Sequence, residues 1–316
     1  MKKLEYLKDV EYSNQYIPDI KLIERKDLRL GNSNINNMII EGENLTAINY
    51  LKDEFKEKID VIYIDPPYNT NVKKLSYKDD FIDLKFSNSH YSWISFMKQR
   101  LNIAYQLLSS NGVMYISIDD VEFAYLLLLC NDLFGEENIK TLIWPKVNPF
   151  FDQNRIEKPI VNIKSEHEYI ITCFKNFKNT KLNHIKHPKL ENNKWVEKEC
   201  FLKTILDNLG TTSSAKDELA KIFGDRYKFL TPKPMKLIKE LIRAASNKDS
   251  FVLDFFAGSG TTGHSVLDLN QEDGGKRKFI LINNNENNIC REITYERIKR
   301  VNKKNIGIKY FTQHSI

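Results

Sequence analysis

Hydrophobic residues along this chain form two patterns, short continuous runs and longer stripes with helical spacing. The runs are typical of buried strands and occupy residues 59–64, 113–118, 250–256 and 278–283. Apolar residues three or four positions apart predict helices over residues 92–109 and 231–246. Apolar strands separated by amphipathic helices predict an α/β fold with a doubly wound, mostly parallel sheet.

Turn and capping signals predict the remaining elements of this fold. Asp119 and Asp120 follow one of the strands and are placed to cap a helix that ends before Gly135. The other predicted elements are a strand, turn and helix over residues 38–55, strands at 139–144 and 168–174, a helix at 287–301 and an edge strand at 306–311.

The regular alternation of strands and helices stops between Pro145 and Lys228. Apart from the strand at 168–174, lysines and aromatic residues interleave here with few acids, which indicates an insertion that does not continue the sheet. We therefore predict a main domain in two parts, residues 1–145 and 229–316, interrupted by an insertion over residues 146–228.

Composition restricts the class of protein. The 316 residues include 48 Lys and Arg against 42 Asp and Glu, and the formal charge of +6 permits a polyanionic partner. No apolar run approaches the roughly 20 residues of a membrane helix and no signal peptide is recognisable, so we expect a cytoplasmic protein. His184 and His187 lack a nearby cysteine or carboxylate, so we expect a solvated pair and no metal site. No CxxC pair occurs, and we expect buried free thiols at Cys130, Cys173, Cys200 and Cys290.

The strand at residues 59–64 ends abruptly in Asp65, Pro66, Pro67 and Tyr68. Open α/β sheets bind ligands at the carboxyl ends of their strands. Two prolines hold such a turn rigid, so the Asp65 carboxylate and the Pro66 carbonyl become fixed hydrogen-bond acceptors that suit an amino group. A tight turn with a capping aspartate is the structural alternative, and the four residues together favour the binding site.

A glycine-rich turn follows the strand at residues 250–256. Gly258, Gly260 and Gly263 match GxGxxG between a strand and a helix, where the pattern indicates nucleotide binding. Glu286 follows the next strand and is placed to accept hydrogen bonds from both hydroxyls of a ribose. Capping of a helix beside Asn287 is the alternative role for this acid.

Four motifs in this chain resemble those of one family. They are DPPYNT at 65–70, FLTPKPMKLI at 229–238, LDFFAGSGTTGHSV at 253–266 and NNENNI at 284–289. The chain resembles the N6-adenine DNA methyltransferases that use S-adenosyl-L-methionine, and among them the modification (Mod) subunits of type III restriction-modification systems. Its motif order resembles the beta arrangement, in which a target-recognition region lies between DPPY and the glycine motif. The resemblance covers both flanking thirds, whereas the middle third matches only loosely.

The resemblance implies a Rossmann-like methyltransferase fold with an inserted target-recognition region. It also implies methyl transfer from S-adenosyl-L-methionine to N6 of an adenine that is flipped out of double-stranded DNA. Asp65 and Pro66 would accept hydrogen bonds from the amine, Pro67 would complete the rigid turn, and Tyr68 would stack on the base. No metal is required. Cofactor contacts would come from Asp254, Phe256, Ala257, Gly258, Ser259, Gly260, Thr261, Glu286, Lys233 and Pro234, with Glu43 and Asn44 as further candidates.

Other functions stay open at this point. The amine of cytosine N4 is the alternative target, and a DNA-binding specificity subunit without catalysis is the alternative class. A nicotinamide dehydrogenase leaves DPPYNT unexplained. Double-stranded DNA is the expected partner, in the bacterial nucleoid, and a homodimer or a restriction subunit are further partners. Type III Mod subunits are usually much longer, so a solitary methyltransferase is an alternative. In the basic middle region we expect Lys175 and Lys178 to contact phosphates.

Overall fold

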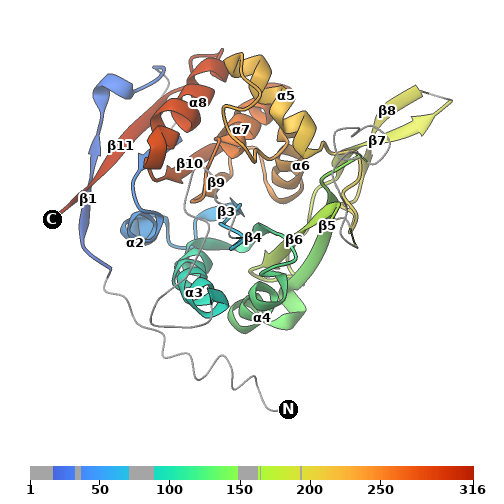
Figure 1. Ribbon diagram of the computed structural model, residues 1–316, viewed down its shortest axis with the longest axis horizontal. Helices are drawn as coiled ribbons and strands as arrows, with labels where there is room; N and C mark the ends of the chain where they lie inside the picture. Colours follow the sequence, from blue (N-terminus) through green and yellow to red (C-terminus); the bar gives the residue numbers. More distant parts are fainter. Residues whose placement is uncertain (1–16, 33–36, 71–88, 149–162, 164, 193) are drawn as a thin grey trace.

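The computed structural model describes residues 17–32, 37–70, 89–148, 163, 165–192 and 194–316. Its centre is a nine-stranded sheet (Figure 1). The strand order is β1 (Ile20–Glu24), β11 (Ile308–Ser315), β2 (Asn37–Glu41), β10 (Lys278–Asn283), β9 (Phe251–Asp254), β3 (Ile59–Ile64), β4 (Leu108–Ile118), β6 (His167–Phe174) and β5 (Ile139–Pro145). The six neighbours from β11 to β4 run parallel, and β1, β6 and β5 are antiparallel to their neighbours. The predicted mostly parallel sheet is therefore confirmed.

Helices cover both faces of this sheet (Figure 1). One face carries α2 (Asn44–Phe55), α3 (Ser89–Leu107) and α4 (Phe123–Phe134), and the other carries α6 (Met235–Ala245), α7 (Thr261–Asp273) and α8 (Glu296–Val301), with α5 (Thr212–Phe223) beside α8. Alternate residues of β3 point to opposite faces, as expected for a strand. Ile62 joins the core under α3, whereas Val61 joins the core under α6. Helices thus cover both sides of β3, and its four residues from Val61 to Ile64 are all buried.

The sequence predicted most helices and strands correctly, but one strand position and one helix cap were predicted wrongly. The runs at residues 59–64 and 278–283 are β3 and β10 with the same bounds. The predicted edge strand is wrong in its position, because β1 covers β11 and makes it internal. Asp119 does not cap α4, whose N-cap is Glu122, and accepts instead from the Val121 amide at 3.0 Å.

The predicted helix over residues 287–301 is interrupted. It begins with a 3-10 turn at Glu286–Asn288, continues as a π-helix at Ile289–Tyr295 and becomes regular only in α8. Asn287 and Asn288 have φ values of 50° and 60°, in the left-handed region that asparagine tolerates better than most residues. Two further 3-10 turns lie at Lys26–Leu28 and Glu136–Asn138.

The segment predicted as an insertion is only partly one. Its strand at residues 168–174 is β6, which lies inside the main sheet between β4 and β5. A boundary at residue 145 therefore cuts through the sheet. Among the described residues of this segment, a hairpin of β7 (Ile185–Glu191) and β8 (Lys194–Cys200) stands outside the main sheet and projects from one end of the molecule (Figure 1). The helix α5 of the same segment packs beside α8.

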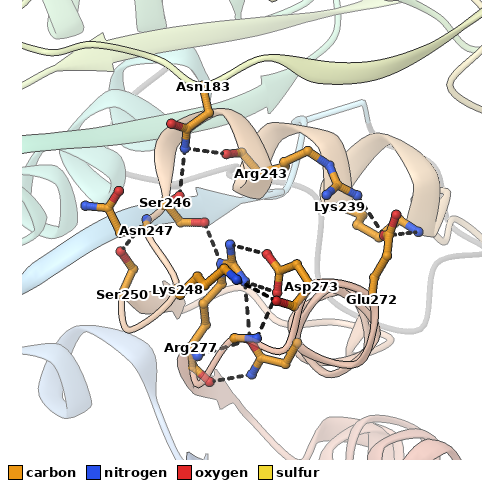
Figure 2. Close-up of polar contacts among 12 residues, drawn as sticks. Asn183, Lys239, Arg243, Ser246, Asn247, Lys248, Ser250, Glu272, Asp273 and Arg277 are labelled. Carbon is orange, nitrogen blue, oxygen red and sulfur yellow. Dashed lines mark hydrogen bonds and ion pairs between the residues drawn. The ribbon is translucent and has the colours of Figure 1, made fainter. Parts of the chain in front are cut away.

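The base of this hairpin is tied to α6 and α7. The Asn183 side-chain amide donates to the carbonyl oxygens of Arg243 and Ser246, at 3.0 and 2.8 Å, and so caps the end of α6 (Figure 2). Glu272 of α7 pairs with Arg243 at 2.7 Å and with Lys186 of β7. These contacts fix the hairpin at its base and leave its far end exposed. Within the described residues, no helix is long and apolar enough to cross a membrane.

Candidate active site

The two corners predicted from the sequence meet at the carboxyl edge of the sheet. β3 and β9 are neighbours, and Ile62 pairs with Leu253. The turns that follow these two strands therefore emerge side by side. Both line one cavity of about 400 Å³, a volume typical of sites for small molecules.

The glycine turn after β9 forms one wall of this cavity. Gly258 and Gly260 have φ values of 46° and 77°, a region that only glycine adopts without strain. A Cβ atom on Gly260 would lie 3.2 Å from the carbonyl oxygen of Thr294. Gly263 lies inside α7, where a Cβ would lie 2.8 Å from the Leu281 side chain. The first two glycines therefore shape the turn, and the third lets α7 pack closely on the sheet.

Asp254 holds this turn together from inside. Its carboxylate accepts hydrogen bonds from the Phe256 amide at 3.0 Å and from the Thr262 hydroxyl at 2.5 Å. Burial raises the pKa of Asp254 to about 7, and the two hydrogen bonds oppose that rise. Because each oxygen has a partner within the turn, we assign this side chain mainly to fixing the backbone that faces the cavity.

Hydrogen bonds from other elements hold the acid-proline corner after β3. The Pro67 carbonyl accepts a hydrogen bond from the Trp93 indole at 2.7 Å, and buried Asn69 donates to Glu122 at 2.6 Å. Pro66 is buried, and within the described residues its carbonyl oxygen accepts no hydrogen bond. The Tyr68 hydroxyl donates to Asp65 at 2.6 Å and so fixes the tyrosine ring beside the carboxylate.

Lys233 reaches this corner from the segment just before α6. Its Nζ atom lies 2.7 Å from both oxygens of Asp65 and 3.0 Å from the Tyr68 hydroxyl. Burial alone lowers the pKa of this lysine, but the carboxylates of Asp65 and Glu168 outweigh burial and raise it. Lys233 therefore carries a positive charge against the predicted catalytic acid, a contact that the sequence did not suggest.

A second buried acid, Glu168 of β6, completes this cluster. Its Oε2 atom lies 3.1 Å from the Tyr68 hydroxyl and 3.3 Å from Lys233 Nζ. Burial raises the pKa of Asp65, Lys233 opposes the rise, and the like charge of Glu168 adds to it. The sequence analysis missed Glu168, although an acid at the start of an otherwise apolar strand was a signal for it.

The other end of the cavity is organised by Arg100 of α3, which was also missed. Its guanidinium donates to Glu43 and to Asn44, each at 2.6 Å, and lies 3.5 Å from the centre of the Phe96 ring. Burial lowers the pKa of Arg100 to about 10, so it stays charged at neutral pH. A charged residue three positions after Met97 on the buried stripe of α3 was the available signal.

The structure brings most of the predicted site residues to this cavity. Those that line it are Asp65, Pro67, Lys233, Asp254, Phe256, Ala257, Gly258, Ser259, Thr261 and Glu286, together with Glu43 and Asn44. Pro66, Tyr68, Gly260 and Pro234 do not line it. Pro234 instead is the N-cap of α6 and lies against Gly210.

Neither the histidines nor the cysteines form a metal site among the described residues. The prediction of a solvated histidine pair is wrong for His187, which is buried and lies 2.9 Å from the Asp207 carboxylate. His184 packs against the ring of Phe201. Free thiols are confirmed, and only Cys200 is not fully buried.

Comparison with known proteins agrees with this geometry. A family model described as DNA methylase matches residues 59–299, more than half of the chain. The chain belongs to the DNA methylase family. Its matched range begins at β3 and includes both corners of the cavity.

Two relatives place this DNA methylase more closely. It is 27% identical, over 87% of its length, to the Mod subunit of the type III restriction-modification enzyme StyLTI from Salmonella typhimurium. It is 29% identical to the type II methyltransferase M.KpnI from Klebsiella pneumoniae, over 77% of this chain and 79% of that protein. The resemblance to Mod subunits is thus confirmed. The chain spans only 57% to 64% of the length of three type III Mod subunits that it matches, those of StyLTI, EcoP15I and EcoPI.

A solved structure has the same fold. A DNA modification methylase from Thermus thermophilus, in complex with S-adenosyl-L-methionine, superposes with a TM-score of 0.54 at 15% identity. The match covers 87% of this chain and 97% of that one. At this identity the likeness concerns the fold, and it supports the doubly wound architecture.

Proposed function

We propose that this DNA methylase transfers a methyl group from S-adenosyl-L-methionine to N6 of an adenine flipped out of double-stranded DNA. One observation carries the proposal. The acid-proline corner and the glycine turn lie far apart in the sequence but open on the same cavity of about 400 Å³. A cofactor against the glycine turn and an amine at Asp65 would thus be neighbours, as a direct transfer between them requires.

The residues of the cavity fit this cofactor. The left-handed glycine turn brings bare backbone to the wall. Glu286 lines the same cavity, and we assign its carboxylate to the ribose hydroxyls. Glu43 and Asn44, held by Arg100, offer further polar contacts at the nucleoside end. When bound, S-adenosyl-L-methionine supplies an electrophilic methyl group on a sulfonium.

The acid-proline corner is suited to bind and orient an amine. Asp65 and the Pro66 carbonyl would provide two acceptors. Acceptance of two N–H bonds favours a pyramidal nitrogen whose lone pair is no longer delocalised into the ring. Tyr68 supplies an aromatic face near this position, and its hydroxyl bond to Asp65 limits the motion of the ring. Base stacking on such a ring offsets part of the cost of extrusion from the duplex. Lys233 belongs with these residues, because its ammonium contacts Asp65.

We assign DNA contact to the middle of the chain, residues 146–228, and in particular to the β7–β8 hairpin. Trp195 and Leu190 face each other across its strands and are 64% and 53% exposed. Lys194, next to Trp195, is exposed as well. Lysines provide phosphate contacts and aromatic side chains provide stacking, so the hairpin combines both kinds of contact. Because DNA would be its substrate, we place the protein in the cytoplasm, at the nucleoid. The partners we propose besides DNA are a second copy of the chain or a restriction subunit.

A methyl-transfer assay tests the proposal. Incubation of the protein with double-stranded DNA and tritiated S-adenosyl-L-methionine should label the DNA, and nucleoside analysis should identify N6-methyladenine. Label in N4-methylcytosine would show that the target is the N4 amine of cytosine instead of N6 of adenine. Absence of label on DNAs of many sequences, with the cofactor bound, would leave only a role in DNA binding.

A further inference from the structure

Glu168 is buried beside the acid-proline corner, and the proposed function gives it no task. Its side chain is 8% exposed, and it comes from β6, a strand outside all of the motifs. Burial of a carboxylate is costly unless it is paired, so its position requires partners. Two of its partners, the Tyr68 hydroxyl and the Lys233 ammonium, also hold Asp65, and a third is the ammonium of Lys146.

Asp65 and Glu168 share the same two hydrogen-bond donors, the Tyr68 hydroxyl and the Lys233 ammonium. The Tyr68 hydroxyl has one proton and two carboxylate neighbours, Asp65 at 2.6 Å and Glu168 at 3.1 Å. Lys233 has three protons and contacts both oxygens of Asp65 at 2.7 Å as well as Glu168 at 3.3 Å. In the structure both donors lean toward Asp65, and Glu168 is the second acceptor within reach.

A target amine must compete with these donors for the Asp65 oxygens. A carboxylate offers about four lone-pair positions, and Tyr68 and Lys233 occupy most of those on Asp65. Displacement of a buried ammonium without another acceptor would leave it unpaired, at high cost. Glu168 is an acceptor already next to both donors, 3.1 Å from the Tyr68 hydroxyl and 3.3 Å from Lys233 Nζ.

We propose that Glu168 is a positioning residue for methyl transfer, which takes over the Lys233 ammonium and the Tyr68 hydroxyl when the target amine binds Asp65. The inference rests on the proposed function. It predicts that the negative charge of Glu168, and not only its shape, is needed for a productive amine complex.

The charged groups around Glu168 come from four other segments. Lys146, which follows β5, lies 3.5 Å from its Oε1 atom, and Asp119 at the end of β4 is close enough for the Glu168 charge to raise the pKa of that aspartate. The others are Asp65 and Tyr68 after β3 and Lys233 before α6. The charge on Glu168 raises the pKa of Asp65, and Lys146 partly compensates that charge.

Two substitutions with opposite expected signs test the proposal. Glu168→Gln keeps an acceptor oxygen but removes the charge, so Lys233 should stay on Asp65 and kcat should fall about tenfold to hundredfold. The acidic limb of the pH profile of kcat should move to lower pH, because the pKa of Asp65 falls without its like-charged neighbour. Lys146→Gln should move the same limb to higher pH, because Glu168 loses a compensating cation.

The control is Glu136→Gln, which removes an exposed carboxylate at the far end of β5 and should leave kcat and the pH profile unchanged. The dissociation constant of S-adenosyl-L-methionine by calorimetry should stay within about twofold in Glu168→Gln. Fluorescence of 2-aminopurine at the target position should report base flipping as in the wild type.

Several results would overturn the inference. One is a Glu168→Gln variant with wild-type kcat and pH profile. Another is a Glu168→Gln variant in which kcat, cofactor affinity and melting temperature all fall while the acidic limb of the pH profile does not shift. That outcome would indicate a purely structural role. Carboxyl ¹³C titration of Asp65, assigned with Asp65→Asn, separates the two proposals. If the wild type methylates no DNA, the proposed function fails whatever the titration shows. If the wild type is active and the titration is the same in Glu168→Gln, only the inference about Glu168 fails.

Discussion

The Nζ atom of Lys233 lies 2.7 Å from both carboxylate oxygens of Asp65, although 168 positions separate the two residues in the sequence. The lysine side chain is 7% exposed and that of the aspartate is 24% exposed. Removal of one member of such a pair leaves the other charge buried and uncompensated, which costs more than the pair contributes when intact. The same contact orients the acid that we assign to the target amine.

This pair makes the stability of single and double variants non-additive. Lys233→Met should lower the free energy of unfolding by about 3 to 5 kcal/mol, because it leaves the buried Glu168 and the partly buried Asp65 as neighbouring acids without their shared cation. Asp65→Ala combined with Lys233→Met should recover part of that loss. Urea unfolding at neutral pH measures both variants, and simple addition of the two single effects would argue against the pairing.

Asp65 should be essential for chemistry and dispensable for DNA affinity. In Asp65→Ala we expect methyl transfer to fall at least about a thousandfold, since a charged acceptor at the reacting amine is lost. The DNA dissociation constant should stay within about threefold, because this carboxylate faces the cavity and not a phosphate. Single-turnover transfer and fluorescence anisotropy give the two values, and a parallel loss of both in a folded variant would contradict the assignment.

Arg100 should act on the cofactor and not on the chemistry. Arg100→Met removes the donor that holds Glu43 and Asn44, so S-adenosyl-L-methionine should bind about tenfold more weakly. At saturating cofactor, kcat should stay within about twofold. Arg29→Met, at an exposed arginine far from the cavity, is the control for loss of positive charge. A fall in kcat with unchanged cofactor affinity would place Arg100 at the reacting end instead.

Gly260 and Gly224 form a matched pair for the glycine turn. Their φ values are 77° and 76°, so alanine costs about 1 kcal/mol of backbone strain at either position. An added Cβ meets nothing within 4 Å at Gly224 but lies 3.2 Å from the Thr294 carbonyl at Gly260. Gly260→Ala should therefore lose more stability than Gly224→Ala, and it alone should lose cofactor affinity. If Gly260→Ala and Gly224→Ala had equal effects on melting temperature and on cofactor affinity by calorimetry, the glycine turn would not form part of the cofactor site.

The lysines of the middle region should not contribute equally to DNA binding. The expectation of a phosphate contact for Lys175 conflicts with the structure, since its Nζ atom donates to the Tyr105 carbonyl at 2.7 Å and lies 3.5 Å from the centre of that ring. Lys194→Ala should reduce the salt slope of DNA binding by about 0.9, as expected for one phosphate contact. Lys175→Ala should leave the slope unchanged and reduce stability. The reverse ranking would move the DNA surface away from the hairpin.

His264 should make the protein sensitive to acid. Burial, with the nearby Arg297 cation, lowers its pKa from an ordinary 6.5 to about 3. The unfolded chain then binds a proton that the folded protein excludes, so the free energy of unfolding falls as pH drops from about 6.5 toward 3. The loss from this one group is on the order of a few kcal/mol. His264→Gln should flatten the difference between unfolding at pH 7 and at pH 4.5, and an unchanged difference would assign acid sensitivity to other groups.

The sequence by itself determined the elements and the two corners. Apolar periodicity is a local property, which is why β3 and β10 match their predicted bounds. Asp65 and Gly258 both line the cavity because strand ends in a parallel sheet share an edge. Strand order depends on pairing between distant segments. Nothing local therefore indicated that β1 would cover β11 or that β6 would enter the sheet beside β4.

Only the tertiary structure decided which charges meet at the site. Lys233 lies in a motif whose expected partner was the cofactor, and Glu168 lies in a strand with no motif, yet both contact the corner that contains Asp65 and Tyr68. A buried charged side chain pairs with whichever group the fold packs next to it. The packing of β6 and of the segment before α6 brings Glu168 and Lys233 to Asp65. No hydrophobic periodicity within either segment indicates this contact.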